Sequence, residues 1–254
     1  MTRHLVIPDT QVKPGQPTEH LEWAARYAVA TKPDVIVHLG DHWDMPSLSS
    51  YDVGKKSFEG RRYAEDVKAG NDAMKAFVNA IRAEQKRLRK HKKRIWKPRM
   101  VFTLGNHEHR IERAVENDAK LEGLMSYEDL YLKDWEVYPF LQPIIIDGVA
   151  YCHYFTSGVM GRPVSNAKLL LQKKHMSAVM GHVQTRDIAF DRDASGKQLT
   201  GLFAGIFYQH DETYLTPQNN TENTWAGLWM FNEVQDGSFD EMPISMRYLR
   251  RRYG

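Results

Sequence analysis

The sequence predicts an α/β fold, and three features of the chain support this prediction. A strand, a helix and a second strand open the chain in that order, which is typical of a parallel α/β unit. A long amphipathic helix and a third strand follow. The later part of the chain is rich in short strand patterns, two of which meet at an Asp-Gly turn.

The opening unit is read from its hydrophobic pattern. His4–Pro8 is expected to be a short buried strand, and Glu19–Ala30 carries apolar residues at helical spacing. The segment Lys32-Pro33-Asp34 breaks this helix, and Val35–Leu39 is expected to form the second strand.

An irregular loop over residues 45–59 leads into a long helix, which we expect to run from Glu59 to about Ile95 and to end because of Pro98. Its apolar residues repeat at seven-residue intervals, so one stripe should face the core. These residues are Val67, Met74, Ile81 and Leu88. Met100–Leu104 is expected to be the third strand.

The remaining elements are shorter. We expect helices at Ile111–Leu124 and Asn166–His175, a hairpin of Ile144–Ile146 with Val149–His153, and a strand at Ser177–Met180. Leu199–Phe207 and Trp225–Val234 are expected strands of a second sheet. Six aromatic residues should lie mostly in the sheet core: Phe203, Phe207, Tyr208, Tyr214, Trp225 and Trp229.

Length and composition suit one soluble domain. The 254 residues are expected to form a single domain over 1–254 with a helical insertion at about 45–98. Hydrophobic residues make up 42% and charged residues 26% of the chain, and no apolar run reaches the roughly 20 residues of a membrane span. Cys152 is the only cysteine, and the start of the chain is too short for a signal peptide, so a cytoplasmic location is expected.

Polar residues follow five expected strands at the point where each strand ends. They are Asp9, Gly40-Asp41-His42-Trp43-Asp44, Gly105-Asn106-His107-Glu108, His153 and Gly181-His182-Val183-Gln184. Each of them alone is typical of a turn or of a hydrogen-bonded core residue. Because ligands bind at the carboxyl ends of strands in open α/β sheets, the five together indicate a metal site.

The same five segments resemble the ordered motifs of calcineurin-like metallophosphoesterases, over roughly residues 5–185. Gly105-Asn106-His107-Glu108 is the most specific of them. The resemblance implies a four-layer fold, in which a two-sheet β-sandwich is flanked by α-helices. It also implies a metal-dependent phosphoric ester hydrolase that uses two divalent metal ions.

The resemblance implies a role for each motif residue. Asp41 would bridge the metals, with Asp9, Gln11 and Gln184 on one side and Asn106, His153 and His182 on the other. Asp41 and His107 would be the catalytic residues. His107 would stabilise or protonate the leaving oxygen, and a water between the metals would be the nucleophile that attacks the phosphate. Asp44 and Glu108 would orient ligands or loops, and Glu108 would orient His107.

The chain departs from the common motif at two positions. Glutamine stands at Gln11 and Gln184, where histidine is usual, and both fall on the same implied metal site. An amide oxygen favours Mn²⁺ or Mg²⁺ at that site, while Zn, Fe or Ni suits the histidine site. A one-metal enzyme and an inactive relative therefore both stay open.

Basic residues supply the candidate contacts to substrate. Arg110 is close enough to the motif to reach a substrate phosphate, although a solvated helix start is the favoured explanation. From Lys86 to Arg99 there are nine Lys/Arg and no Asp or Glu, which suits DNA or RNA as well as a solvated helix end. The candidate nucleic-acid contacts are Arg89, Lys90, Lys92, Lys93, Arg94 and Trp96.

The motifs leave the substrate open. A phosphodiesterase acting on nucleic acid or a nucleotide is favoured because of the basic run. A phosphomonoesterase acting on a nucleotide or phosphoprotein is the alternative, and a non-catalytic nucleic-acid- or metal-binding relative is another. No membrane partner is expected, and the oligomeric state cannot be read from the sequence.

Overall fold

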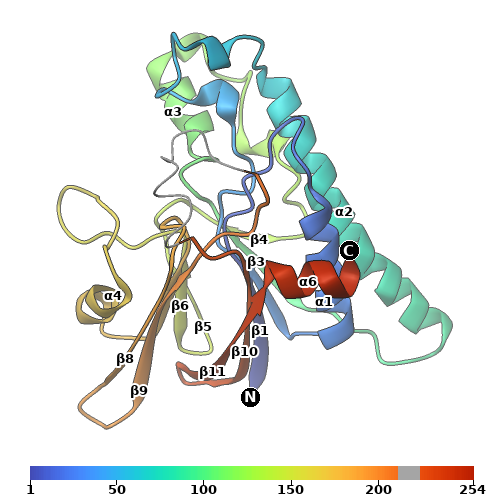
Figure 1. Cartoon of the computed structure of the whole chain (residues 1–254), viewed down its shortest axis with the longest axis vertical. Coiled ribbons are helices and arrows are strands. Elements are labelled where there is room, and N and C mark those ends of the chain that lie inside the picture. Colours follow the sequence, from blue (N-terminus) through green and yellow to red (C-terminus); the bar gives the residue numbers. More distant parts are fainter. Residues whose placement is uncertain (211–223) are drawn as a thin grey trace.

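The computed structural model describes residues 1–210 and 224–254. Two β-sheets pack face to face and helices cover their outer faces, which confirms the predicted fold class (Figure 1). The first sheet has six strands in the order β11-β10-β1-β2-β3-β4, and the second has five in the order β5-β6-β7-β9-β8.

The first sheet has a parallel centre and an antiparallel edge. Its strands are β1 (Thr2–Ile7), β2 (Val35–His38), β3 (Arg99–Thr103), β4 (Glu136–Tyr138), β10 (Gly227–Gln235) and β11 (Ser238–Ser245). Strands β1 to β4 are parallel, so their carboxyl ends meet at one edge. Strand β10 pairs antiparallel with β1, and β11 pairs antiparallel with β10, whereas the sequence predicted that the strand near Trp225–Val234 belongs to the second sheet.

The second sheet is built around a hairpin. Its strands are β5 (Ile144–Ile146), β6 (Val149–Cys152), β7 (Ala178–Met180), β8 (Arg186–Arg192) and β9 (Gln198–Ala204). The predicted hairpin turn is present, with Asp147 and Gly148 at φ 49° and 83°. Strands β6, β7 and β9 are parallel, so the carboxyl ends of β6 and β7 lie at the same edge of the sheet. Strand β8 was not predicted, because its polar residues mask the strand pattern.

A sandwich core fills the space between the sheets. Val6, Val37 and Val101 from the first sheet pack with Tyr151 and Val179 from the second. Four of the expected core aromatics are buried (Phe203, Phe207, Tyr208 and Trp229), Trp225 is half-buried, and Tyr214 lies outside the described residues. The apolar faces hold the two sheets together and bring their strand ends toward each other.

Helices α1 (Glu19–Thr31), α2 (Tyr63–Lys90) and α6 (Met246–Tyr253) lie on the outer face of the first sheet (Figure 1). The predicted stripe of α2 is confirmed, since Met74, Ile81 and Leu88 are all buried. Helix α6 was not predicted, and it begins where Ser245 caps the Tyr248 N–H at 3.2 Å.

Helix α2 is shorter than predicted at both ends. It begins at Tyr63 and ends at Lys90, so Pro98 does not end it. Lys92 adopts a left-handed φ of 52°, which stops the helix, and the chain then runs without regular secondary structure into β3. The Trp96 indole fixes this segment, because its Nε1 donates to the Pro33 carbonyl at 2.7 Å.

The two remaining helices are short. Helix α3 covers Arg110–Asn117 rather than 111–124, because Asp118 is extended and accepts the Lys120 N–H at 3.1 Å. Helix α4 (Ala167–Lys174) lies on the second sheet and matches its prediction, with Asn166 capping the Leu169 N–H at 2.8 Å. Short 3-10 turns occupy the connections at Pro46–Leu48, Lys56–Phe58, Ala119–Leu121 and Tyr127–Asp129.

Among the described helices, none combines the length and the apolar character that a bilayer crossing requires.

Candidate metal centre

The five predicted strand ends meet at one edge of the sandwich. Asp41 follows β2 with a left-handed φ of 49°, and this bend turns its carboxylate toward the ends of the neighbouring strands. Glycine leaves the space that the carboxylates need, because a Cβ at Gly105 would collide with the Asp41 carboxylate and one at Gly181 with Asp9 Oδ1. The glycines of these two motifs are therefore required by packing.

Asp41, His153 and His182 form the centre of the site, with possible ligand atoms that all lie within 4.8 Å of one another. His153 Nε2 lies 3.3 Å from Asp41 Oδ2 and 2.8 Å from Asn106 Oδ1. On the other side of the ring, His153 Nδ1 donates to the Leu39 carbonyl at 2.8 Å. That bond holds the ring so that Nε2 faces the oxygen atoms of Asp41 and Asn106.

Asp9, Gln11 and Gln184 surround the same carboxylate. The Asp9 carboxylate is buried and accepts the His182 N–H, with 3.1 Å to each oxygen. The Gln11 N–H donates to the Asp41 carbonyl at 2.9 Å. Gln11 Oε1 is buried and accepts no hydrogen bond from the described part of the chain, and an orphaned buried oxygen calls for a cation or a water.

The residues present fit a divalent metal. Carboxylate, amide and imidazole groups converge in a buried space, and these are the usual ligands of Mn²⁺, Mg²⁺ and Zn²⁺. Burial raises the pKa of Asp9 to about 7, helped by the charge of Asp41 and opposed by His153. Burial alone would lower the pKa of His153, but Asp41 raises it to about 9. Without a metal, a proton on His153 supplies the positive charge that these carboxylates require.

His107 lies beside the centre and is held by Asp44. Its Nδ1 lies 2.8 Å from both Oδ1 and the backbone carbonyl of Asp44, and its Nε2 lies 3.7 Å from Asp41 Oδ2. Burial would lower the pKa of His107, but Asp41 and Asp44 raise it. Burial would likewise raise the pKa of Asp44, but its hydrogen bond to His107 and the nearby Lys13 and Arg110 lower it to about 2.

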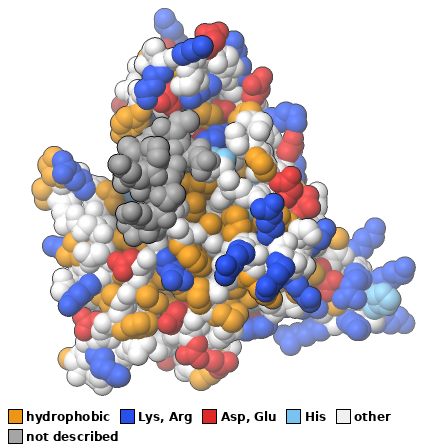
Figure 2. All heavy atoms as spheres, viewed as in Figure 1, with side chains coloured by type: hydrophobic (Ala, Val, Ile, Leu, Met, Phe, Trp, Pro, Cys, Tyr) orange, Lys and Arg blue, Asp and Glu red, His pale blue; other side chains and the backbone are white. Residues whose placement is uncertain are grey.

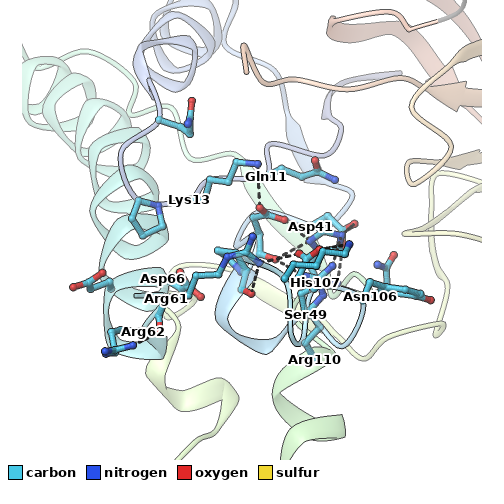
Figure 3. A pocket seen from close by; sticks show the side chains of 18 of the residues that line it. Gln11, Lys13, Asp41, Ser49, Arg61, Arg62, Asp66, Asn106, His107 and Arg110 are labelled. Carbon is cyan, nitrogen blue, oxygen red and sulfur yellow. Dashed lines mark hydrogen bonds and ion pairs between the residues drawn. The ribbon is translucent and has the colours of Figure 1, made fainter. Parts of the chain in front are cut away.

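Arg110 contacts His107 directly. Its Nη2 lies 3.2 Å from His107 Nε2, while Nη1 donates to the carbonyls of Asp44 at 2.7 Å and Met45 at 3.1 Å. The guanidinium is half-buried and lines the cavity (Figure 3). Arg110 begins α3, as the alternative reading expected, but its side chain is half-buried rather than solvated.

Glu108 has a different contact from the one predicted. Its carboxylate accepts four backbone N–H groups, from Gly105 at 2.8 Å, Asp41 at 2.9 Å, His42 at 2.6 Å and Trp43 at 3.0 Å. It therefore joins the loop after β2 to the loop after β3. The expectation that it orients His107 is wrong, because Asp44 makes that contact.

A cavity of about 910 Å³ opens above the centre. Asp41, Asn106, His107, His182 and both glutamines line it, together with residues that lead into α2 (Figure 3). Sequence reasoning missed its basic wall residues Lys13, Lys55, Arg61 and Arg62. It also missed Tyr154, whose ring centroid lies 4.6 Å from that of His182. No motif links these five residues, since only the folded chain brings the four cations to the cavity and Tyr154 to His182.

The predicted nucleic-acid contacts do not lie at this cavity. Arg89, Lys90, Lys92, Lys93 and Arg94 are exposed near the last turn of α2, whereas its first turn supplies Glu65 and Asp66 to the cavity wall. Trp96 is half-buried against the core and its Nε1 donates to the Pro33 carbonyl, so its ring has a structural role in this segment.

Comparisons with known proteins add little to this geometry. No family model and no curated protein matches the chain. A solved structure described as YfcE, a phosphoesterase from E. coli, aligns at a TM-score of 0.40 and 12% identity, covering 96% of this chain and 100% of that chain. At this TM-score the likeness supports no conclusion about the present chain, so function must be argued from the site.

Proposed function

We propose that this chain is a metal-dependent phosphoesterase of the calcineurin-like superfamily, acting on a phosphodiester. The observation that carries the proposal is the convergence of Asp41, His153 and His182, whose possible ligand atoms lie within 4.8 Å of one another. These residues follow three different strands, β2, β6 and β7. A structural role alone does not explain why three strand ends direct such groups to one point.

Two divalent ions would be held here, one by Asp9, Gln11 and Gln184 and one by Asn106, His153 and His182, with Asp41 shared. When bound, such ions neutralise phosphate charge and lower the pKa of water, which supplies a nucleophile at neutral pH. The buried Asp9 and Asp41 carboxylates support this assignment, because burying two carboxylates side by side is costly without cations.

His107 and Arg110 are placed to act on the ester itself. Both line the cavity, and His107 Nε2 lies 3.7 Å from Asp41 Oδ2, close to any group held at the centre. Asp44 keeps the ring oriented from its Nδ1 side, so Nε2 is the atom that would give a proton to the leaving oxygen. Arg110 would bind a non-bridging phosphate oxygen, and this interaction would draw its Nη2 away from His107.

The cavity supports a phosphodiester substrate. Its volume of about 910 Å³ exceeds what a phosphoryl group fills, which leaves room for a substituent on each side of the phosphorus. Basic residues continue along its wall, where Arg61 and Arg62 lie on the α2 side away from Asn106 (Figure 3). Arg61 is paired with Asp52 at 2.8 Å, and Glu59, Glu65 and Asp66 lie on the same wall, so the exposed Arg62 is the cation that a flanking phosphate would meet there.

The experiment compares hydrolysis of bis-p-nitrophenyl phosphate and p-nitrophenyl phosphate with added Mn²⁺, Mg²⁺ or Zn²⁺. We expect faster metal-dependent cleavage of the diester, with Mn²⁺ or Mg²⁺ most effective because of the two glutamines. An Asp41→Asn protein is the control, and it should lose activity with every metal. A clear monoester preference would favour a phosphatase. No turnover by folded, metal-loaded protein would contradict the proposal and leave a binding protein.

A further inference from the structure

The end of α2 that lies away from the cavity carries an exposed cluster of cations, which we call the basic end. It consists of Arg89, Lys90, Lys92, Lys93, Arg94 and Lys97. All six side chains are exposed, and the structure records no ion pair for any of them with residues 1–210 or 224–254. Figure 2 shows Lys and Arg gathered at this projecting end of the molecule.

Helix stability explains only part of this cluster. Positive charge near a helix C-terminus is favourable, but the effect is limited to the last turn. Arg89 and Lys90 lie in that turn, whereas Lys92 to Lys97 follow the end of α2 at Lys90. Like charges crowded on one surface repel one another, so these later cations cost stability unless a partner neutralises them.

A nearby surface carries the same charge. Helix α6 contacts α1, which in turn packs beside α2. Arg247, Arg250, Arg251 and Arg252 of α6 are exposed, and Arg26 of α1 donates to the Tyr253 carbonyl at 2.8 Å. Basic side chains over α6 and over the end of α2 are visible on the same face (Figure 2). A polyanion can therefore contact both groups.

The chemistry of the basic end favours nucleic acid over a membrane. A membrane-binding surface adds exposed apolar or aromatic anchors to its cations. Here Leu88 is 3% exposed, and Trp96 turns inward to bond to Pro33. A surface of cations without apolar anchors suits the repeated phosphates of a nucleic-acid backbone.

The basic end and the cavity lie at opposite ends of α2, whose 28 residues are about 42 Å long at 1.5 Å per residue. We propose that the basic end is a second, sequence-independent nucleic-acid binding surface that tethers a long strand while the cavity acts elsewhere on it. This inference rests on the proposed function in one respect, which is that the bound nucleic acid is also the substrate. A duplex shorter than roughly 12 base pairs cannot span both surfaces, at 3.4 Å per base pair.

The test measures binding of a fluorescein-labelled duplex of roughly 30 base pairs by anisotropy, in EDTA, over about 50 to 200 mM salt. The variant is Lys90→Gln/Lys93→Gln/Lys97→Gln, and the matched control is Lys120→Gln/Lys168→Gln/Lys173→Gln, which removes three exposed lysines elsewhere. We expect the first variant to weaken binding at least tenfold and to reduce the salt slope by about 2 to 3. The control should bind nearly as the parent protein does.

Three results would overturn the inference: equal binding by both variants and the parent protein, equal weakening by both variants, or binding to phosphatidylserine vesicles but not to the duplex. Failure of catalysis is a separate outcome, because the binding assay contains no metal and needs no turnover. If the protein is active, the first variant should keep its rate on bis-p-nitrophenyl phosphate and lose kcat/KM only on long nucleic acid. Equal loss on a dinucleotide would also contradict a tether.

Discussion

The carboxylate of Asp44 lies 2.8 Å from Nδ1 of His107, which fixes the imidazole while leaving Nε2 directed to the cavity. The contact joins the loop after β2 to the loop after β3. It defines Asp44 as a positioning residue for His107.

Asp44→Asn should lower kcat on bis-p-nitrophenyl phosphate by roughly 10- to 100-fold, because His107 loses the charged partner of its Nδ1 and keeps only the Asp44 carbonyl, at 2.8 Å. KM should change little, since Asp44 does not belong to the metal ligands proposed above. Steady-state kinetics at saturating Mn²⁺ checks this split. A large rise in KM with kcat intact would show that Asp44 acts on substrate binding instead.

Glu108→Gln should destabilise the fold. The carboxylate accepts four N–H groups, and a glutamine would place an NH₂ against some of these donors. We expect the free energy of unfolding to fall by about 2 to 4 kcal/mol in urea titrations. Glu116→Gln, an exposed change on α3, is the control and should alter it by less than about 0.5 kcal/mol.

Gly70→Ala should destabilise α2, against the usual effect of alanine in a helix. A Cβ at position 70 would collide with the Trp43 ring, which is fully buried beside the Asp41 loop. The expected loss in unfolding free energy is about 1 to 3 kcal/mol. Gly158→Ala meets no atom within 4 Å and should be nearly neutral. A stabilised Gly70→Ala protein would contradict the packing described here.

The burial of His20 makes the free energy of unfolding depend on pH. Burial, with smaller effects from His42 and His210, lowers its pKa to about 3, and neither ring nitrogen has a hydrogen-bond partner among the described residues. The unfolded chain takes up a proton at about pH 6.5, so the stability from neutral His20 is present above that pH. It decreases as pH falls from about 6.5 toward 3.

The His20→Leu protein should therefore lose less unfolding free energy than the parent protein as pH falls. The difference between the two should grow by up to about 2 kcal/mol between pH 8 and pH 5. Urea titrations at pH 8, 6.5 and 5 measure this change. His91→Gln, at an exposed position, is the control and should follow the parent curve. Parallel curves for His20→Leu and the parent would refute the assignment.

Metal binding should occur in two classes of affinity. The site with Gln11 and Gln184 has neutral amide oxygens, so it should release its ion first when metal is diluted. Metal counting by mass spectrometry at falling Mn²⁺ concentration should show a step from two ions to one. Gln11→His/Gln184→His should raise Zn²⁺ retention at the weaker site. Two ions of equal affinity in the parent protein would contradict this interpretation.

The sequence predicted the strand ends well because short-range patterns define them. Asp9, Asp41, Asn106, His153 and His182 each follow a strand pattern, and parallel pairing brings such ends together. Pairing partners were harder to predict. Strand β10 has an ordinary apolar pattern, and only the tertiary structure places it beside β1 rather than in the second sheet.

Side-chain contacts across long sequence distances were also missed. Glu108 could not be assigned to the N–H groups of Asp41 to Trp43 before the two loops were placed together. Trp96 follows a basic run and suggested base stacking, but its indole bonds to Pro33, which the sequence separates by 63 positions. The sequence shows which charged and aromatic residues are present, but which of them are buried depends on the whole fold.

The position of β1 also has a consequence for synthesis of the chain. Thr2 pairs with Val234, so β1 leaves the ribosome 232 residues before the β10 residue that pairs with it. Until then one side of β1 is an open edge, able to pair with other chains. Such distant pairing slows folding, so a nascent chain stalled before residue 227 is the species most exposed to aggregation.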